Sequence, residues 1–367
     1  MTAPALASVR SPIMVRPKRY RSFGAGAREF CLVADTDLAA AYEIDADGYE
    51  HASAVPIGGT DRLDDVLRSA VPDPADVLVI CRRSFVTSPG ESAMGGRRMI
   101  VMPCASTPVT SEQIQYFLSV LEATDPQAQA RRAEAFFTAV ESAESLLLTD
   151  AATKCRFEAL AGDYAWNQQA GPLAPGEQQI APPGELSVLP MEITDFDPSA
   201  GFALDGSLTL CGQPIVHAGY DDTLVRRQAI LYQRLRPLTS TPVIVDVAAG
   251  VITACRPGEP GPAGLELVKA LDRLFTADPR YRVIWELGFG INTDMRLFPA
   301  NCGLNEPFGG SDGVVHIGVG LTPFTEFALT FLCPSTVLAD ESGSRLIGGT
   351  PIRKINRTRS ASCGCHS

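Results

Sequence analysis

Hydrophobic residues are distributed differently in the two parts of this chain. In the first part they form continuous apolar runs, and a helical spacing appears between some of them. Continuous runs rich in Val, Ile and Leu are typical of strands that are buried on both faces, and helices between such strands indicate parallel pairing. We therefore expect a small α/β layer, with strands near residues 30–35, 77–82 and 98–104 and a short helix at residues 63–70.

Two amphipathic helices are predicted to close this first part. Residues 111–123 place apolar side chains on one helical face, and Thr110 or Ser111 is the expected N-cap. The second helix covers residues 126–144 and begins with Pro126, which suits a first helical turn.

From Ser145 onward, short β-prone runs alternate with turn residues, as they do in antiparallel sheets. One well-marked helix is predicted at residues 264–275. The chain as a whole is therefore expected to have an α+β (mixed α/β) fold. The expected parts are a mobile basic arm (1–28), an α/β N-terminal domain (29–144), a β-rich domain (145–356) and a disordered tail (357–367).

Charge and composition narrow the classes of function. The formal net charge of −11 argues against a nucleic-acid-binding protein, because phosphate recognition requires a positive surface. No apolar run reaches the length of about 18 residues that a transmembrane helix needs. The N-terminal residues also lack the continuous apolar segment of a secretory signal. We expect a cytoplasmic protein that binds neither nucleic acid nor membrane.

Most of the ten cysteines stand alone inside apolar runs, where they act as small buried hydrophobic residues. Cys363, Cys365 and His366 instead lie close together near the end of the chain. Two interpretations stay open for them: a set of soft ligands for zinc or copper, or a frayed terminus without a ligand.

Two pairs of arginines adjoin predicted strand ends, Arg82 with Arg83 and Arg97 with Arg98. Strand ends of an α/β sheet commonly form the ligand crevice, and guanidinium groups bind carboxylates in a bidentate way. The four arginines are therefore candidates for contacts with an acidic peptide. The alternative interpretation is an ordinary solvated rim of the sheet.

Candidate metal chemistry lies between residues 281 and 320. An apolar run carries Glu286, a glycine-rich loop follows, and a second apolar run carries His316. A carboxylate and an imidazole on neighbouring strands are the beginning of a metal site. Cys302, in the loop, is an alternative candidate as a nucleophile paired with His316. The sequence contains no serine-hydrolase elbow, phosphate-binding loop or H-E-x-x-H motif.

A series of segments between about residues 145 and 350 resembles the catalytic domain of the M29 (aminopeptidase T) peptidases. In chain order they are LTDAATKCRFEALAGDYAW, PPGELSVLP, AGFALDGS, VIWELGFGIN, GVVHIGVG and CPSTVLAD. Members of that family are exopeptidases that use two divalent cations. The resemblance assigns metal-ligand positions to Glu185, Glu286 and His316.

The remaining ligand positions of that family differ here. Glu326 stands where the resemblance implies a histidine, and Ala328 stands where it implies an aspartate. Alanine offers no ligand atom, whereas the carboxylate of Glu326 is able to bind a cation. A full pair of metal shells is therefore not expected. One cation bound by Glu185, Glu286, His316 and Glu326 is the largest site that the sequence supports.

The preferred hypothesis is a pseudo-peptidase without a catalytic residue or a cofactor, which binds a precursor peptide. Degenerate peptidase-like proteins of this kind resemble accessory factors that act with the modifying enzymes of ribosomal peptide pathways such as crocagin formation. The alternative is a metallo-aminopeptidase or a peptide-modifying enzyme with one divalent metal such as zinc. The resemblance also implies a homodimer, because M29 relatives form dimers.

Overall fold

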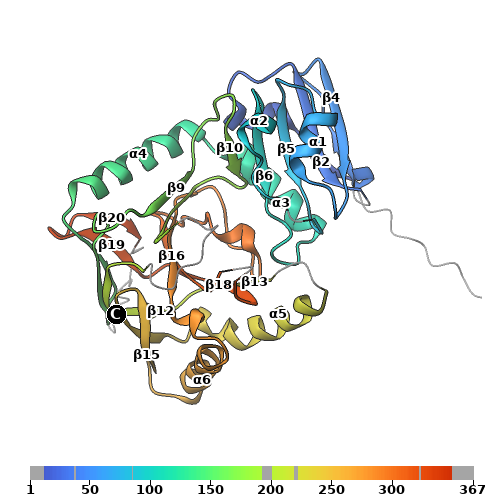
Figure 1. Cartoon of the computed structure of the whole chain (residues 1–367). Coiled ribbons are helices and arrows are strands. Elements are labelled where there is room, and N and C mark those ends of the chain that lie inside the picture. The colour runs from blue at the N-terminus through green and yellow to red at the C-terminus, as the bar shows by residue number, and fades with distance from the viewer. Residues whose placement is uncertain are drawn as a thin grey trace, which may run out of the picture.

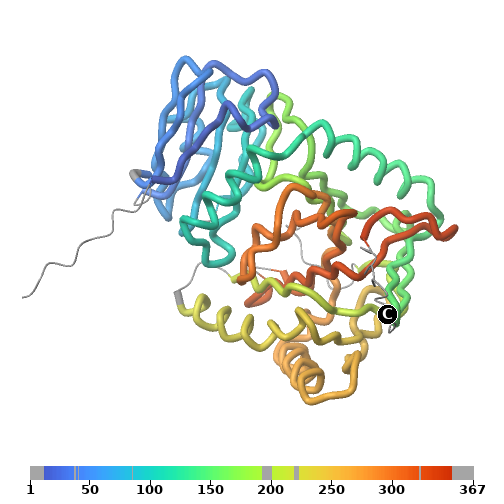
Figure 2. The backbone as a smooth tube through the Cα atoms, turned by 180° about the vertical axis from the view of Figure 1, so that it is seen from behind, coloured from blue at the N-terminus to red at the C-terminus, as the bar shows by residue number. Residues whose placement is uncertain are grey.

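The computed structural model describes residues 12–36, 39–84, 86–191, 201–218, 222–321 and 324–348. Two modules lie side by side, a smaller N-terminal module drawn in blue and cyan and a larger module drawn from green to red (Figures 1 and 2). The predicted α+β fold is confirmed. Among the described residues, no helix is both long and apolar enough to cross a membrane.

The N-terminal module is built on a parallel sheet of five strands, in the order β10-β6-β5-β2-β4. Its strands are β2 (Glu29–Asp35), β4 (His51–Ile57), β5 (Asp76–Ile80), β6 (Arg98–Met102) and β10 (Gln178–Ile180), and its helices are α1 (Leu63–Ala70), α2 (Glu91–Met94) and α3 (Ser111–Ala123). The central strand β5 is buried along its whole length, as the continuous apolar run predicted. Thr110 caps α3, and its side chain and that of Gln113 form a capping box.

Residues 12–28 belong to this module, which corrects the expectation of a mobile arm for that part of the chain. Strand β1 (Ile13–Val15) pairs in parallel with β3 (Tyr42–Ile44), and Tyr20 and Phe23 are buried in the core. Aromatic burial of this size outweighs the basic character of the segment. Residues 1–11 lie outside the described part of the chain, as do residues 357–367 with Cys363, Cys365 and His366.

The larger module consists of two mainly antiparallel sheets. The first has the order β13-β18-β17-β16-β11-β9 and contains β9 (Ala165–Gln169), β11 (Glu185–Leu189), β13 (Pro214–Ala218), β16 (Ile284–Gly290), β17 (Val314–Val319) and β18 (Phe327–Cys333). The second has the order β15-β14-β12-β8-β7-β19-β20 and contains β7 (Leu146–Thr149), β8 (Lys154–Phe157), β12 (Leu204–Leu210), β14 (Val243–Ala248), β15 (Val251–Pro257), β19 (Val337–Asp340) and β20 (Arg345–Gly348). Helices α4 (Pro126–Ser142), α5 (Asp222–Leu235) and α6 (Pro262–Ala277) accompany these sheets.

Each module contains an element from the other side of the predicted boundary at residue 144. Helix α4 packs Ala133, Phe136 and Val140 into the core of the larger module. In the opposite direction, β10 follows β9 in the chain but pairs with β6 of the N-terminal sheet. The junction between the modules is therefore built from both parts of the chain.

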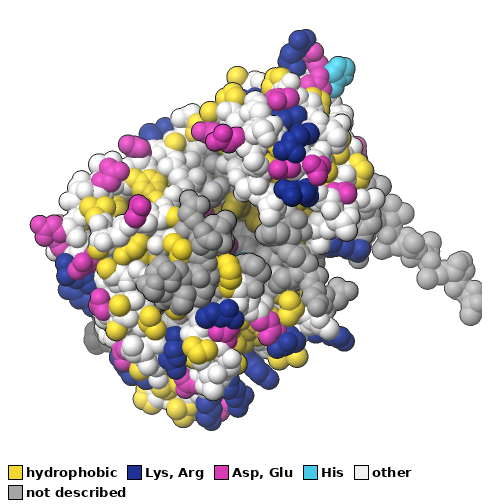
Figure 3. Space-filling view, in the orientation of Figure 1, with side chains coloured by type: hydrophobic (Ala, Val, Ile, Leu, Met, Phe, Trp, Pro, Cys, Tyr) yellow, Lys and Arg dark blue, Asp and Glu magenta, His cyan; other side chains and the backbone are white. Residues whose placement is uncertain are grey.

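The outer surface carries charges of both signs. On the face shown in Figure 3, basic and acidic side chains are interspersed over the N-terminal module, with no extended positive area. This face therefore offers no broad positive surface for phosphate groups.

Candidate functional site

Three adjacent strands bring Glu185, Glu286 and His316 together. Glu185 is the first residue of β11, Glu286 lies on β16 and His316 lies on β17. One ligand atom from each residue lies within 4.8 Å of the other two, and Glu185 and His316 are buried. Separations of this size suit three ligands of one cation after a small adjustment. The group thus provides a donor set for a single divalent ion.

Glycines opposite these side chains provide the space for them. Gly288 lies across from His316 in the β16–β17 ladder, and Gly318 lies across from Glu286. A Cβ atom on Gly288 would stand 1.7 Å from His316 Nε2, and one on Gly318 would stand 2.8 Å from Glu286 Cβ. The glycine-rich motifs ELGFG and HIGVG therefore make room for the charged groups inside the sheet.

The electrostatics of this group follow from its burial. Burial raises the pKa of Glu185 and raises the pKa of Glu286 to about 7. Burial opposes the charged form of His316, but the neighbouring Glu185 carboxylate outweighs it and raises the histidine pKa to about 9. His316 Nε2 lies 3.5 Å from Glu185 Oε1, and neither ring nitrogen has a well-formed hydrogen bond within the described structure.

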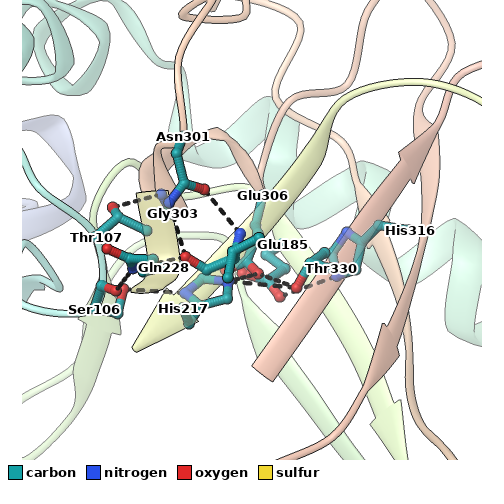
Figure 4. A network of polar contacts seen from close by, with 11 residues as sticks. Ser106, Thr107, Glu185, His217, Gln228, Asn301, Gly303, Glu306, His316 and Thr330 are labelled. Carbon is teal, nitrogen blue, oxygen red and sulfur yellow. Dashed lines mark hydrogen bonds and ion pairs between the residues drawn. The ribbon is translucent and has the colours of Figure 1, made fainter. Parts of the chain in front are cut away.

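A second histidine–glutamate pair, which the sequence analysis missed, lies in the same network (Figure 4). His217 Nε2 is 3.1 Å from Glu306 Oε1, and His217 Nδ1 is 3.1 Å from Ser106 Oγ. Thr330 Oγ1 donates a hydrogen bond of 2.7 Å to Glu306 Oε1. In contrast to His316, both ring nitrogens of His217 have partners.

The shifted pKa values of Glu306 and His217 favour the charged form of both groups. Burial would raise the pKa of Glu306, but the charge and hydrogen bond of His217 hold it at about 2. Burial disfavours the charged form of His217, yet Glu306 outweighs this effect and raises the histidine pKa. Both directions favour a carboxylate beside an imidazolium group.

Backbone contacts around His217 join the two modules. Gln228 Nε2 donates to the backbone oxygens of Ser106 (2.8 Å) and Val216 (2.7 Å). The Gly303 N–H donates to Thr107 Oγ1 at 2.9 Å. Ser106 and Thr107 follow β6 of the N-terminal module, so this network holds its loop against β13 and α5 (Figure 4).

The other positions suggested by the family resemblance lie apart from the three-residue group. Glu326 Oε2 accepts a hydrogen bond of 2.7 Å from Arg227, and its side chain is 31% exposed. Ala328 lies directly across from His217 in the β13–β18 ladder. A histidine on the neighbouring strand thus stands beside the position where the resemblance implies an aspartate.

Cys302 is not placed to act with His316. It is fully buried in the apolar core of the N-terminal module. Burial raises its pKa to about 12, so the sulfur is a protonated thiol at neutral pH. A nucleophilic cysteine needs the opposite conditions, and we correct that alternative.

The arginine pairs differ in their availability to a ligand. The guanidinium group of Arg97 is buried and donates to backbone oxygens of Leu67, Val71, Pro72 and Ala93. Arg98 forms an ion pair with the buried Asp76. Both are structural cations, which leaves them unable to bind a peptide carboxylate.

Arg82 and Arg83 lie at the carboxyl end of β5, where their backbone N–H groups bond to Asp35.

A family model described as "Crocagin biosynthetic protein CgnE/B" matches residues 60–326, which is more than half of the chain. The chain belongs to the CgnE/B family. All the residues of both histidine–glutamate pairs fall within the matched part. A comparison with curated proteins by sequence finds no match.

Solved structures extend the comparison to the fold of this CgnE/B family member. The 2,5-dihydroxypyridine dioxygenase from Pseudomonas putida KT2440 is similar with a TM-score of 0.53 and 15% identity, over 91% of this chain and 95% of the dioxygenase chain. The wild-type AmpT structure from Thermus thermophilus has a TM-score of 0.42 and 12% identity, over 87% of this chain and 92% of that chain. At these identities the dioxygenase similarity concerns the fold alone.

Proposed function

We propose that this protein binds a precursor peptide without hydrolysing it, as an accessory factor in the biosynthesis of a ribosomally made, modified peptide. Membership in a family of crocagin biosynthetic proteins supports the role in peptide natural-product biosynthesis. The absence of turnover is our inference from the site. A protein that binds the peptide without turnover leaves the modification chemistry to other enzymes of the same pathway.

The observation that carries the non-hydrolytic part is the size of the metal-ligand group. Within the described residues, only Glu185, Glu286 and His316 place one ligand atom each within 4.8 Å of the others. His217 and Glu306 lie in the same network, but they pair with one another. Glu326 pairs with Arg227, and Ala328 has no donor atom. A dimetal mechanism requires ligands for both ions, including a bridging group, and three side chains do not provide them. Two metal ions therefore do not fit this donor set.

Binding of the precursor peptide tests the proposal most simply. The experiment is a fluorescence-anisotropy titration of the purified full chain with a labelled peptide encoded by a neighbouring gene, and with a scrambled peptide of equal composition as control. We expect a dissociation constant near about 1 µM, which corresponds to about −8 kcal/mol. Equal affinity for the two peptides would contradict specific peptide binding.

A second candidate function is favoured by the geometry of the same group. One divalent cation such as zinc fits three converging ligands, and His316 has buried ring nitrogens without well-formed hydrogen bonds. Glu185, Glu286 and His316 would hold the ion, which would supply a Lewis acid when bound. Metal analysis of protein purified without chelator tests this candidate. About one ion per chain, lost in both Glu185→Ala and His316→Ala, would support it; a metal-free chain would exclude it.

A further inference from the structure

A cavity at the junction of the modules has a lining that no part of the histidine–glutamate network uses. Its volume is about 190 Å³. Its lining residues come from α1, the loop after β5, β6, β9 and β10: Leu63, Val86, Thr87, Ser88, Met99, Val101, Pro103, Gln169, Gln178, Gln179 and Ile180. All of them lie within the residues that the family model matches.

The floor of this cavity is one face of the parallel sheet. Met99 pairs with Gln178 and Val101 pairs with Ile180 in the β6–β10 ladder, so these four side chains share a face. Leu63, at the start of α1, and Val86 add apolar walls. The floor therefore depends on β10, the strand that the larger module contributes to the N-terminal sheet.

The chemistry of the lining defines the class of ligand. No Lys, Arg, Asp, Glu or His is among the lining residues, whereas amide and hydroxyl groups come from Gln169, Gln178, Thr87 and Ser88. An apolar cavity of about 150 Å³ is large enough for benzene. A space of 190 Å³ therefore accepts one large neutral side chain, with polar groups at its border for the adjoining amides.

A buried amide beside the cavity has an unused hydrogen-bond acceptor. Gln179 is 5% exposed, and its Nε2 donates to Gly171 O at 3.2 Å. Its Oε1 has no hydrogen-bond partner within the described structure. A buried acceptor without a partner is unfavourable, so a donor at this place would bind. Gln179, like Gln178, also lines a second, more polar hollow of about 400 Å³ beside β10, and a small shift of its buried side chain would present this acceptor to a peptide N–H group.

We propose that this junction cavity is the specificity pocket for one apolar or aromatic side chain of the bound peptide. The proposal rests on the proposed peptide-binding function and adds to it the location of the site and the class of residue recognised. The uncharged lining selects a neutral side chain, and the glutamine amides on β9 and β10 bond to the peptide backbone. Peptide binding then spans both modules.

The test uses small probes so that it does not depend on knowledge of the peptide. Ligand-observed NMR with the full chain measures binding of N-acetyl-tryptophanamide and N-acetyl-leucinamide, with N-acetyl-lysinamide as the charged control. We expect the two neutral apolar probes to bind and the lysine derivative not to bind. Failure of both apolar probes to bind, or equal binding of all three, would overturn the proposal.

A bulky substitution at the exposed border of the cavity tests whether the probe binds inside it. In Thr87→Trp the new ring fills the entrance without changing the sheet, and Thr60→Trp places the same ring on an exposed position outside the cavity. We expect apolar probe and precursor peptide to bind at least tenfold more weakly to Thr87→Trp only, with unchanged unfolding midpoints. Unchanged binding to Thr87→Trp would overturn the pocket while leaving peptide binding intact. Failure of the wild-type chain to bind the precursor would instead overturn the proposed function.

Discussion

The two histidine–glutamate pairs use the same residue types but differ in how fully their hydrogen bonds are satisfied. His217 has Glu306 on one ring nitrogen and Ser106 on the other, and Thr330 adds a further bond to Glu306. His316 is fully buried beside two carboxyl groups of raised pKa, and neither of its ring nitrogens has a well-formed hydrogen bond to the described residues. A satisfied pair contributes to holding the fold, whereas an unsatisfied one retains capacity for a ligand. We therefore interpret the His217 pair as a junction between modules and the His316 group as donors that remain available to a ligand.

The largest expected effect comes from filling the space beside His316. Gly288→Ala would place its Cβ atom 1.7 Å from His316 Nε2, so the fully buried ring would have to move. We expect the free energy of unfolding to fall by about 3 kcal/mol or more. Gly59→Ala is the matched control, because a Cβ atom there meets nothing within 4 Å. Urea denaturation measures both variants, and equal stabilities would contradict the packing described for Gly288.

The second effect concerns the satisfied pair. Glu306→Gln keeps the shape of the side chain but removes its negative charge. The wild-type carboxylate faces His217 and accepts a hydrogen bond from Thr330. We expect a loss of about 2 kcal/mol, because a partly buried imidazolium group loses its counter-charge. Glu266→Gln, which changes an exposed partner of Lys269, serves as the control. A Glu306→Gln chain as stable as the control would mean that the pair does not hold the junction.

A smaller effect is expected from pH, and its sign follows from the raised pKa values. The stabilising contribution of His316 is complete below its ordinary pKa of 6.5 and is lost as the pH rises through about 9. Glu286 acts in the same direction at lower pH, because the contribution of its neutral form is lost as the pH rises from 4.5 through about 7. We expect the metal-free protein to lose about 1–2 kcal/mol of unfolding free energy between pH 6.5 and 9. A stability that rises over this range would refute the assignment, and a double variant His316→Gln with Glu286→Gln should show a flatter profile.

The smallest effect is expected at Glu326, the position that the sequence had suggested as a fourth ligand. Its contact with Arg227 is a partly exposed ion pair. Glu326→Ala should therefore change the stability by no more than about 0.5–1 kcal/mol. It should also leave any bound metal in place, as measured by the metal content of the purified variant. If this variant alone lost its metal, Glu326 would be a metal ligand after all.

The sequence predicted the residues of the His316 group because they lie in glycine-rich strand motifs with a recognisable order. It did not reveal His217 or Glu306, because a histidine in the short run PIVHA and a glutamate in a loop carry no local signal. Their meeting depends on β13 pairing with β18, which is a long-range contact. Burial of Arg97 was also hidden, because an arginine that binds backbone oxygens has the same local sequence as an exposed one.

The fold class was predictable from the two apolar patterns, whereas the junction between the modules was not. Residues 178–180 are Gln-Gln-Ile and carry no strand pattern of their own. Their pairing with β6 is fixed by tertiary packing, which decides between sheets that offer similar edges. The cavity beside β10 follows from that pairing, so no sequence pattern predicts it.

The most direct test of the central claim combines binding with product analysis. The full chain, treated with chelator and then supplied separately with zinc, manganese or cobalt, is incubated with the precursor peptide, and the mass of the peptide is measured after its binding has been established. We predict specific binding with and without chelator and an unchanged peptide mass in every sample. Shortening of the peptide from its N-terminus, dependent on metal and abolished by Glu185→Ala and His316→Ala, would contradict the account.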